Sequence, residues 1–283
     1  MRFFTPSDEY LPQIKNLCST CFDMESDEVE YVFENKYIST EICYAIEDNG
    51  KLCCMLFTVP CTMFFSNETI KGHYIYGACT MAEYRHRGLM HRLIEYTTKK
   101  SAEKGDAFSA LLPANEKLYD FYGTMGYRPL YNAHNEFVKK EILPNLKSEI
   151  AYVLKENISF MANIRKKICS KYNGTVNYNS DIIKYAVKYA NECSGGVVIC
   201  KYGYIIYSYN DYNILIVQEI ICDKKHLDIM LGLLKKICQS EKIMLRLPPW
   251  LSENNKHFGM VKILNNTVNT DEFNMAYLGL TFD

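Results

Sequence analysis

The chain has 283 residues, of which 48% are hydrophobic and 23% charged, and its formal net charge is −1. This composition is typical of a globular protein, and the length suffices for one large domain or two ordinary ones. A chain this close to neutral has no general field to attract nucleic acid or an anionic membrane, and no stretch reaches the apolar length of a membrane span. We therefore expect neither nucleic acid nor a membrane as a partner.

The twelve cysteines are too sparse for a disulfide scaffold in a chain of this length. Charged residues occur early, at Arg2 and Asp8, and no apolar signal segment precedes them. We therefore expect reduced thiols and a cytoplasmic location. Cys18 and Cys21 form a single Cys-x-x-Cys within a helical pattern, without the second pair that a metal site needs, so we predict no metal.

The first 40 residues predict helices, since Tyr10, Ile14 and Leu17 recur at helical spacing. An antiparallel meander follows, because Asp48-Asn49-Gly50 is a strong hairpin signal between two apolar runs. The pattern then alternates between strands and helices. The expected elements are strands at 41–47, 51–65 and 70–81, a helix at 89–104, a strand at 107–112, a short helix from 113 to 123, and a strand at 127–138.

A similar order of elements returns in the second half of the chain. Residues 140–175 predict a charged helical connector, and the later elements suggest a second copy of the same architecture. The expected fold class is α/β (α+β), with a mixed central sheet flanked by helices. The predicted elements are helices at 181–191 and 226–239 and strands at 196–201, 204–209, 213–222, 243–247, 260–264 and 276–282.

The segment 82–90 follows a predicted strand and opens a predicted helix. The start of a helix leaves backbone N–H groups unpaired, and the helix dipole adds partial positive charge there, so a diphosphate fits such a place. Gly88 lets the backbone approach a ligand closely, while Arg85, His86 and Arg87 add positive charge. The segment alone equally suits a solvated helix end.

The same segment resembles the motif of the GNAT superfamily of acyl-CoA-dependent N-acyltransferases, Arg/Gln-x-x-Gly-x-Gly/Ala after the fourth strand. Arg85, Gly88 and Met90 occupy its three positions. Met90 replaces the usual small residue and would narrow the pyrophosphate site unless its side chain points into the core. A second segment, from Asn115 through Tyr119 and Tyr122 to Gly126-Tyr127, is similar to the Asn…Phe/Tyr-Tyr-x-x-x-Gly-Phe block of the family.

The variant Arg-x-Arg-Gly-Leu-Met-x-Arg is also similar to the enhanced-intracellular-survival type of tandem-GNAT acetyltransferase, whose second module is degenerate. The matching segment of the second half, 223–228, lacks the Arg-x-x-Gly pattern. The resemblance thus implies a catalytic GNAT domain at 1–140, a helical connector at 141–175 and a degenerate GNAT-like domain at 176–283. Members of that group often carry a third, sterol-carrier-like domain, and this chain is too short for one.

The resemblance further implies N-acetyl transfer from acetyl-CoA, as cosubstrate, to a primary amine of a small molecule or peptide. Tyr122 matches the tyrosine that often protonates the departing thiolate, and a phenol is protonated at neutral pH. Tyr122 equally suits a packing role on an amphipathic helix. The residues expected to hold acetyl-CoA are Cys79, Thr80, Arg85, His86, Arg87, Gly88, Leu89, Met90 and Asn115.

No general base is evident, and His73, Glu83 and the C-terminal Asp283 are the candidates. The main alternative function is a CoA-binding module without catalysis, serving in regulation or assembly. Transfer to an aminoacyl-tRNA or a lipid-linked amine is a further alternative, disfavoured by the neutral charge. Acidic residues of the segment 25–30 could attract a cationic acceptor or form a solvated helix face, and the sequence leaves a homo-oligomer open.

Overall fold

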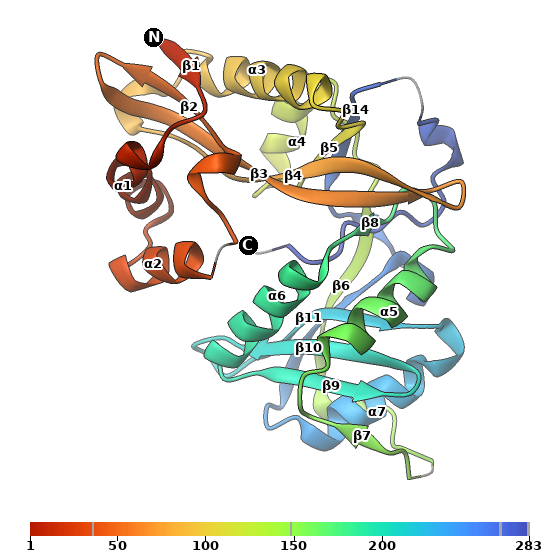
Figure 1. Ribbon diagram of the computed structural model, residues 1–283. Helices are drawn as coiled ribbons and strands as arrows, with labels where there is room; N and C mark the ends of the chain where they lie inside the picture. Colours follow the sequence, from red (N-terminus) through yellow and green to blue (C-terminus); the bar gives the residue numbers. More distant parts are fainter. Residues whose placement is uncertain (36, 148, 266–267, 282–283) are drawn as a thin grey trace. The chain divides into compact units, whose positions relative to one another are not determined.

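The computed structural model describes residues 1–35, 37–147, 149–265 and 268–281. The chain divides into two compact units, each assembled from segments far apart in the sequence (Figure 1). Unit 1 contains Met1–Thr62, Ile70–Arg128 and Met260–Val268, and unit 2 contains Met63–Thr69, Pro129–Gly259 and Asn269–Asp283.

Unit 1 begins with a short strand that the sequence pattern did not predict. The strand β1 (Arg2–Phe4) pairs antiparallel with β2 (Cys43–Asp48), and three residues are too few to display a period. The predicted helices follow as α1 (Leu11–Phe22) and α2 (Ser26–Glu34). The buried residues of α1, Ile14, Leu17 and Cys18, lie on one face at helical spacing.

The sheet of unit 1 has the strand order β1-β2-β3-β4-β5-β14. The turn between β2 and β3 (Lys51–Phe65) has positive φ angles at Asn49 (50°) and Gly50 (82°), as the hairpin signal predicted. The strand β4 (Glu68–Thr80) pairs parallel with β5 (Phe108–Leu111), and α3 (Leu89–Glu103) connects them. This is the strand–helix–strand order that the sequence predicted.

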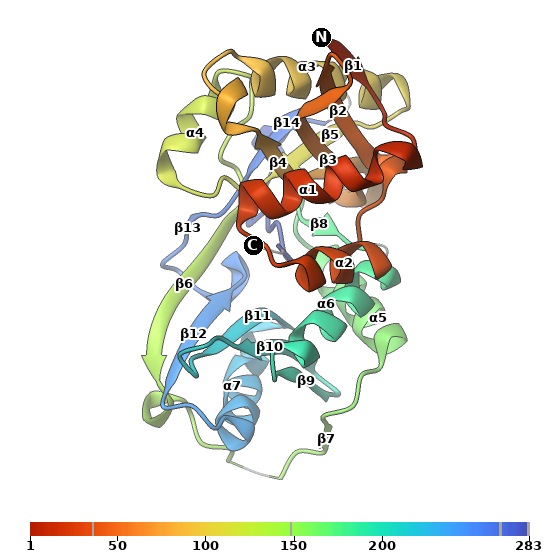
Figure 2. The same cartoon turned by 90° about the vertical axis from the view of Figure 1, so that its left-hand side faces the viewer.

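Helices cover both faces of this sheet. The helix α1 crosses one face, while α3 and α4 (Glu116–Gly123) lie on the other (Figure 1, Figure 2). On the α3 side, Leu93 and Ile94 join a buried cluster with Ile46, Leu56 and Ile75 from three strands. The sheet is thereby held between two hydrophobic layers, as a mixed α/β fold requires.

The strand that follows β5 in the sheet comes from the far end of the chain. The strand β14 (Met260–Ile263) pairs antiparallel with β5, and Arg128 bridges to Val261. Conversely, β6 (Asn132–Lys139), which follows α4 in sequence, belongs to the sheet of unit 2. The compact units therefore differ from the expected limits at residues 140 and 175, because strand pairing between distant segments leaves no local sequence pattern.

The sheet of unit 2 has the order β13-β6-β12-β11-β10-β9-β7. The segment expected as a helical connector contributes β7 and α5 to this unit, and α5 buries Met161, Arg165 and Ile168 within it. The elements are β7 (Tyr152–Val153), α5 (Ile158–Cys169), β8 (Val176–Asn177), α6 (Ser180–Glu192), β9 (Gly196–Cys200), β10 (Gly203–Tyr209), β11 (Leu215–Cys222), α7 (Leu227–Ile237), β12 (Lys242–Leu247) and β13 (Lys256–His257).

Unit 2 repeats one feature of unit 1. Its strands β11 and β12 are parallel and are joined through α7, as β4 and β5 are joined through α3. The expected strand at 276–282 is not formed: residues 276–281 are buried but irregular, and their backbone bonds go to single partners such as Val176 and Asn132. Apolar composition here reflects burial rather than strand pairing.

A charged pair lies in the centre of unit 2. The side chains of Arg165 and Glu219 are fully buried and 3.2 Å apart, and the Tyr204 hydroxyl donates to Glu219 at 2.5 Å. A buried pair needs such additional hydrogen bonds to offset the loss of hydration.

Candidate active site

The parallel strands β4 and β5 separate partway along β4. Only Gly72, His73 and Tyr74 pair with β5, and no described residue of β5 pairs with residues 75–80. Gly77 has a positive φ of 59°, and a Cβ there would meet the Phe57 ring at 3.1 Å. A bend of this kind in a strand leaves backbone N–H and C=O groups free for a ligand on the side facing β5.

The segment after β4 turns sharply into α3. A short 3₁₀ helix (Ala82–Tyr84) is followed by positive φ angles at His86 (61°) and Gly88 (69°), the residue that caps α3. Within the part of the chain that the structure describes, the backbone N–H groups of residues 87–90 have no hydrogen-bond acceptor. Apart from its chain neighbours and the backbone of its own helix, no described atom lies within 4 Å of an ideal Cβ at Gly88, so the space over the helix start is open.

Two arginine side chains brace this loop. Arg85 Nε donates to the carbonyl of Thr80 at 3.0 Å, and Arg87 donates to the carbonyl of Glu83 at 2.7 Å. Both residues remain exposed, as does His86. Free N–H groups, the helix dipole and two guanidinium groups together suit a phosphate-bearing ligand.

The side chains of Leu89 and Met90 are directed away from this space. Leu89 is buried, and Met90 is half-buried and packs against the hydrophobic cluster of unit 1. Met90 therefore does not fill the space above Gly88, and its size leaves the backbone N–H group accessible there.

The helix α4 carries the other expected residues. Asn115 caps its start, is exposed and makes no capping hydrogen bond with its side chain. Tyr122 is buried, with its ring 5.2 Å from that of Phe121 and 5.9 Å from that of Tyr127. Burial raises the pKa of Tyr122 to about 12, so its hydroxyl stays protonated at neutral pH.

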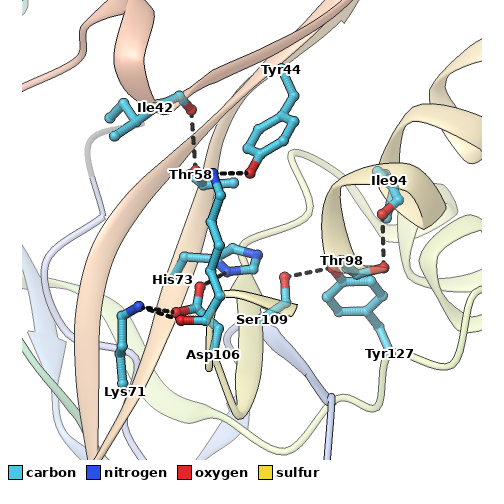
Figure 3. Close-up of polar contacts among 11 residues, drawn as sticks. Ile42, Tyr44, Thr58, Lys71, His73, Ile94, Thr98, Asp106, Ser109 and Tyr127 are labelled. Atoms are coloured by element: carbon cyan, nitrogen blue, oxygen red, sulfur yellow. Dashed lines mark hydrogen bonds and ion pairs between the residues drawn. The ribbon is translucent and has the colours of Figure 1, made fainter. Parts of the chain in front are cut away.

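The three candidates for a general base lie in different surroundings. His73 is 1% exposed and contacts Asp106 through Nδ1 at 2.8 Å, and Lys71 pairs with the same carboxylate at 3.1 Å (Figure 3). It lies in the paired part of β4, seven residues and roughly 20 Å along the strand from Thr80. This position favours a structural role for His73.

Glu83 is exposed in the loop and pairs with Lys51 at 2.8 Å. The hydrogen bond from Lys51 lowers the pKa of Glu83, which makes its carboxylate a weaker base. Asp283 lies outside the described residues. Of the two described candidates, Glu83 is the one that belongs to the loop at the open end of β4.

One residue near this site was missed by the sequence interpretation. Cys79 of β4 and Arg85 lower the pKa of Cys21, assigned only to a single Cys-x-x-Cys, to about 7. No sequence signal could have found it, because the three residues lie on α1, β4 and the loop.

The acidic residues of α2 line a hollow of about 570 Å³ together with Tyr31. Lys15 already pairs with one of them, Glu30, at 2.5 Å. The lining residues are Glu25, Ser26, Asp27, Glu30, Tyr31 and Glu34.

Among the described residues, no group of three or more His, Cys, Asp or Glu side chains could hold a metal ion. None of the helices described is long and apolar enough to cross a membrane.

Comparisons with known proteins agree with this architecture. Residues 3–130 match the family model of an acetyltransferase (GNAT) domain. No curated protein matches the sequence significantly.

Solved structures match over 93% of the chain. They include a GCN5-related N-acetyltransferase from Anabaena variabilis (19% identity, TM-score 0.76, 73% of its chain covered) and one from Kribbella flavida (14%, 0.73, 72%). Eis1 from Mycobacterium abscessus also matches (12% identity, TM-score 0.68, 73% of its chain). These likenesses show the fold of the chain, and the match to the GNAT acetyltransferase domain model covers residues 3–130 of it.

Proposed function

We propose that this protein transfers an acetyl group from acetyl-CoA to a primary amine of a small molecule or peptide. The observation that carries the proposal is the separation of β4 from β5, which ends in a loop with free N–H groups and two exposed arginines. Backbone groups left free along a strand suit an extended thioester arm, and free N–H groups at a helix start suit a diphosphate at one end of that arm.

In this proposal, the diphosphate binds the backbone N–H groups of residues 87–90, with Arg85, His86 and Arg87 supplying positive charge. The arm follows β4 past Thr80 and Cys79 and hydrogen-bonds to its free backbone groups. Asn115, whose side chain is not used to cap α4, contacts the arm from the other side. The thioester carbonyl gains oxyanion stabilisation from a fixed N–H donor of β4.

The chemical step requires a neutral amine. Its nitrogen attacks the thioester carbonyl, the C–S bond breaks, and the amine proton leaves to a base or to water. Tyr122 then donates its hydroxyl proton to the departing thiolate. The raised pKa of Tyr122 supports this role, because the phenol remains a donor throughout the neutral range.

Isothermal titration with acetyl-CoA tests the binding part of the proposal. We expect Arg87→Glu to weaken binding at least about tenfold, because a charge-assisted contact is lost. Lys99→Glu, an equal change of charge at an exposed position farther along α3, is the matched control and should bind like the wild type. No binding by the wild type would overturn the proposal.

A thiol-release assay with a panel of primary amines tests turnover. Release of CoA that depends on an amine supports the acetyltransferase. Binding without release for any amine would favour the alternative, a CoA-binding module in regulation or assembly.

A further inference from the structure

In unit 2, a histidine side chain lies between a serine hydroxyl and a carboxylate. His134 and Glu136 are two residues apart on β6, so their side chains leave the same face of the sheet. His134 Nδ1 is 2.5 Å from the hydroxyl oxygen of Ser252, and its Nε2 is 3.5 Å from a carboxylate oxygen of Glu136. A nucleophile, a base and a group that orients the base therefore follow one another in a single chain of contacts.

The contacts of Ser252 direct its proton to the imidazole. The backbone N–H of Asn254 donates to Ser252 Oγ at 3.2 Å, which leaves the hydroxyl proton for His134 Nδ1. The carboxylate of Glu136 beside Nε2 favours a proton on that nitrogen. Both contacts favour the neutral imidazole with its lone pair facing the hydroxyl, the state in which a histidine acts as a base.

The loop that carries Ser252 is held in place on both sides. The buried side chain of Trp250 donates its ring N–H to the carbonyl of Cys222 at 3.1 Å. On the other side, the amide of Asn255 donates to the carbonyls of Pro249 and Ser252 at 3.1 and 2.9 Å. The hydroxyl is thus positioned by groups outside the chain of contacts, as a reactive nucleophile requires.

This hydroxyl is reachable from solvent and has a backbone donor next to it. Ser252 is half-buried, and the side chain of His134 is 14% exposed. Among the described residues, the backbone N–H of Glu253 has no hydrogen-bond acceptor. The N–H of the residue after a nucleophilic serine can stabilise the oxyanion that forms when the serine attacks a carbonyl.

The charges around Ser252 indicate which acyl compounds it can take. Carboxylates lie on Glu136 and on Glu253, and the second is paired with Lys224 at 3.2 Å. Negative charge near the hydroxyl disfavours an anionic substrate. A half-buried hydroxyl in a loop also suits a short acyl group, because a long chain needs an enclosed apolar pocket.

We propose that Ser252, His134 and Glu136 form a second site, which hydrolyses uncharged esters of short carboxylic acids. Ser252 Oγ attacks the ester carbonyl as its proton moves to His134 Nδ1, and the bond to the alcohol oxygen breaks as His134 returns the proton to that oxygen. Water then attacks the acyl-serine with the same help from His134, and the acid leaves as Ser252 regains its proton. In total, one ester and one water give one acid and one alcohol.

In this site Glu136 is a positioning residue, since it acts through His134. The site belongs to unit 2 alone, and it stands independently of the acetyltransferase proposed above.

Labelling of the full-length protein with a fluorophosphonate, followed by tryptic mass spectrometry, tests the nucleophile directly. We expect the label in the segment 247–256, in which Ser252 is the only hydroxyl side chain. Ser252→Ala should lose this label. Ser180→Ala is the matched control, since Ser180 is exposed at the start of α6, and it should be labelled at the wild-type rate.

The roles of the other two residues are separated by rescue. His134→Ala should slow the labelling at least about a hundredfold, because the base is lost, and added imidazole should restore part of the rate. Glu136→Gln should slow it at least about tenfold, and Glu136→Asp should recover part of that loss, which a purely structural role of the side chain would not produce.

Hydrolysis of p-nitrophenyl acetate by the same variants measures turnover. We expect a steady release of nitrophenolate that Ser252→Ala lacks. Absence of label from the segment 247–256 of the wild type, or labelling of His134→Ala at the wild-type rate, would overturn the proposal. A burst of one nitrophenolate per chain with no further release would overturn the hydrolytic step and leave Ser252 as an acylated nucleophile.

Discussion

Tyr122 and Cys21 show how surroundings within one unit shift ionisation in opposite directions. Burial among aromatic rings raises the pKa of Tyr122 to about 12, while Cys79 and Arg85 lower that of Cys21 to about 7. The first group therefore stays protonated at neutral pH, whereas the second ionises close to neutral pH. Such divergence is common at functional sites, although packing alone also produces a raised phenol pKa.

Tyr122→Phe tests the role of the phenol. We expect kcat to fall about 10²-fold, because a general acid is lost, with little change in the KM for acetyl-CoA. The phenol stays protonated below its raised pKa, so the wild-type kcat should show no loss from Tyr122 as the pH rises to about 10. Steady-state kinetics from pH 6 to 10 provide both measurements. An unchanged kcat in the variant would leave Tyr122 with packing alone.

The same shift affects stability, with a definite sign. The pKa of Tyr122 in the folded protein exceeds its value near 10 in the unfolded chain. The contribution of the protonated phenol to the free energy of unfolding is therefore complete below about pH 10 and is lost as the pH rises through about 12.

At the scale of elements, β4 is the strand on which the proposed site depends. Its first part is paired with β5 and its last part is not, so in the proposed function the position where this pairing stops sets where the acyl-CoA arm binds. Gly72 permits the close approach of the two strands, since a Cβ there would overlap the ring of Phe108 and lie 2.5 Å from its backbone oxygen. The pairing of β4 with β5 therefore depends on the absence of a side chain at Gly72.

Gly72→Ala should therefore destabilise the protein by about 2–3 kcal/mol, because the methyl group forces the strands apart. Gly123→Ala in α4 is the control: beyond its chain neighbours and its own helix backbone, no described atom lies within 4 Å of its ideal Cβ, so this variant should change the free energy of unfolding by less than about 1 kcal/mol. Urea denaturation of both variants measures the difference. Equal stability of the two variants would show that β4 and β5 adapt to a side chain at position 72.

At the scale of the whole chain, each unit contains a strand whose neighbours in sequence belong to the other unit. The sheet of unit 1 takes β14 from residues 260–263, while β6, which follows α4, joins the sheet of unit 2. A division of the chain near residue 140 would leave β5 without its antiparallel neighbour and β6 without its sheet. Unpaired strand edges of this kind favour aggregation.

We expect a fragment of residues 1–140 to lack a cooperative thermal transition, in contrast to the full chain. The reason is that β14 supplies four residues of pairing with β5, and Val261 also exchanges backbone hydrogen bonds with Arg128 at 2.8 and 2.9 Å. Circular dichroism melting and the dispersion of an amide NMR spectrum measure this. A well-dispersed spectrum from the fragment would show that unit 1 folds without β14.

Local features of the sequence were sufficient for much of the fold. The hairpin at Asn49-Gly50, the helices α3 and α4, and the α/β order of both halves follow from turn residues and hydrophobic periods, which act over a few neighbouring residues. The segment Arg85–Met90, which resembles the GNAT motif, is likewise short, and it lies within residues 3–130, which match the GNAT domain model.

Packing between layers decides which distant segments meet. The pairing of β14 with β5 and the buried contact of Arg165 with Glu219 join residues that are far apart in the chain. Such contacts depend on the summed packing of whole layers, which no local period records. The elements and the motif segment could therefore be predicted from the sequence, whereas the strand order and the chemical surroundings of each side chain depend on how the elements pack in three dimensions.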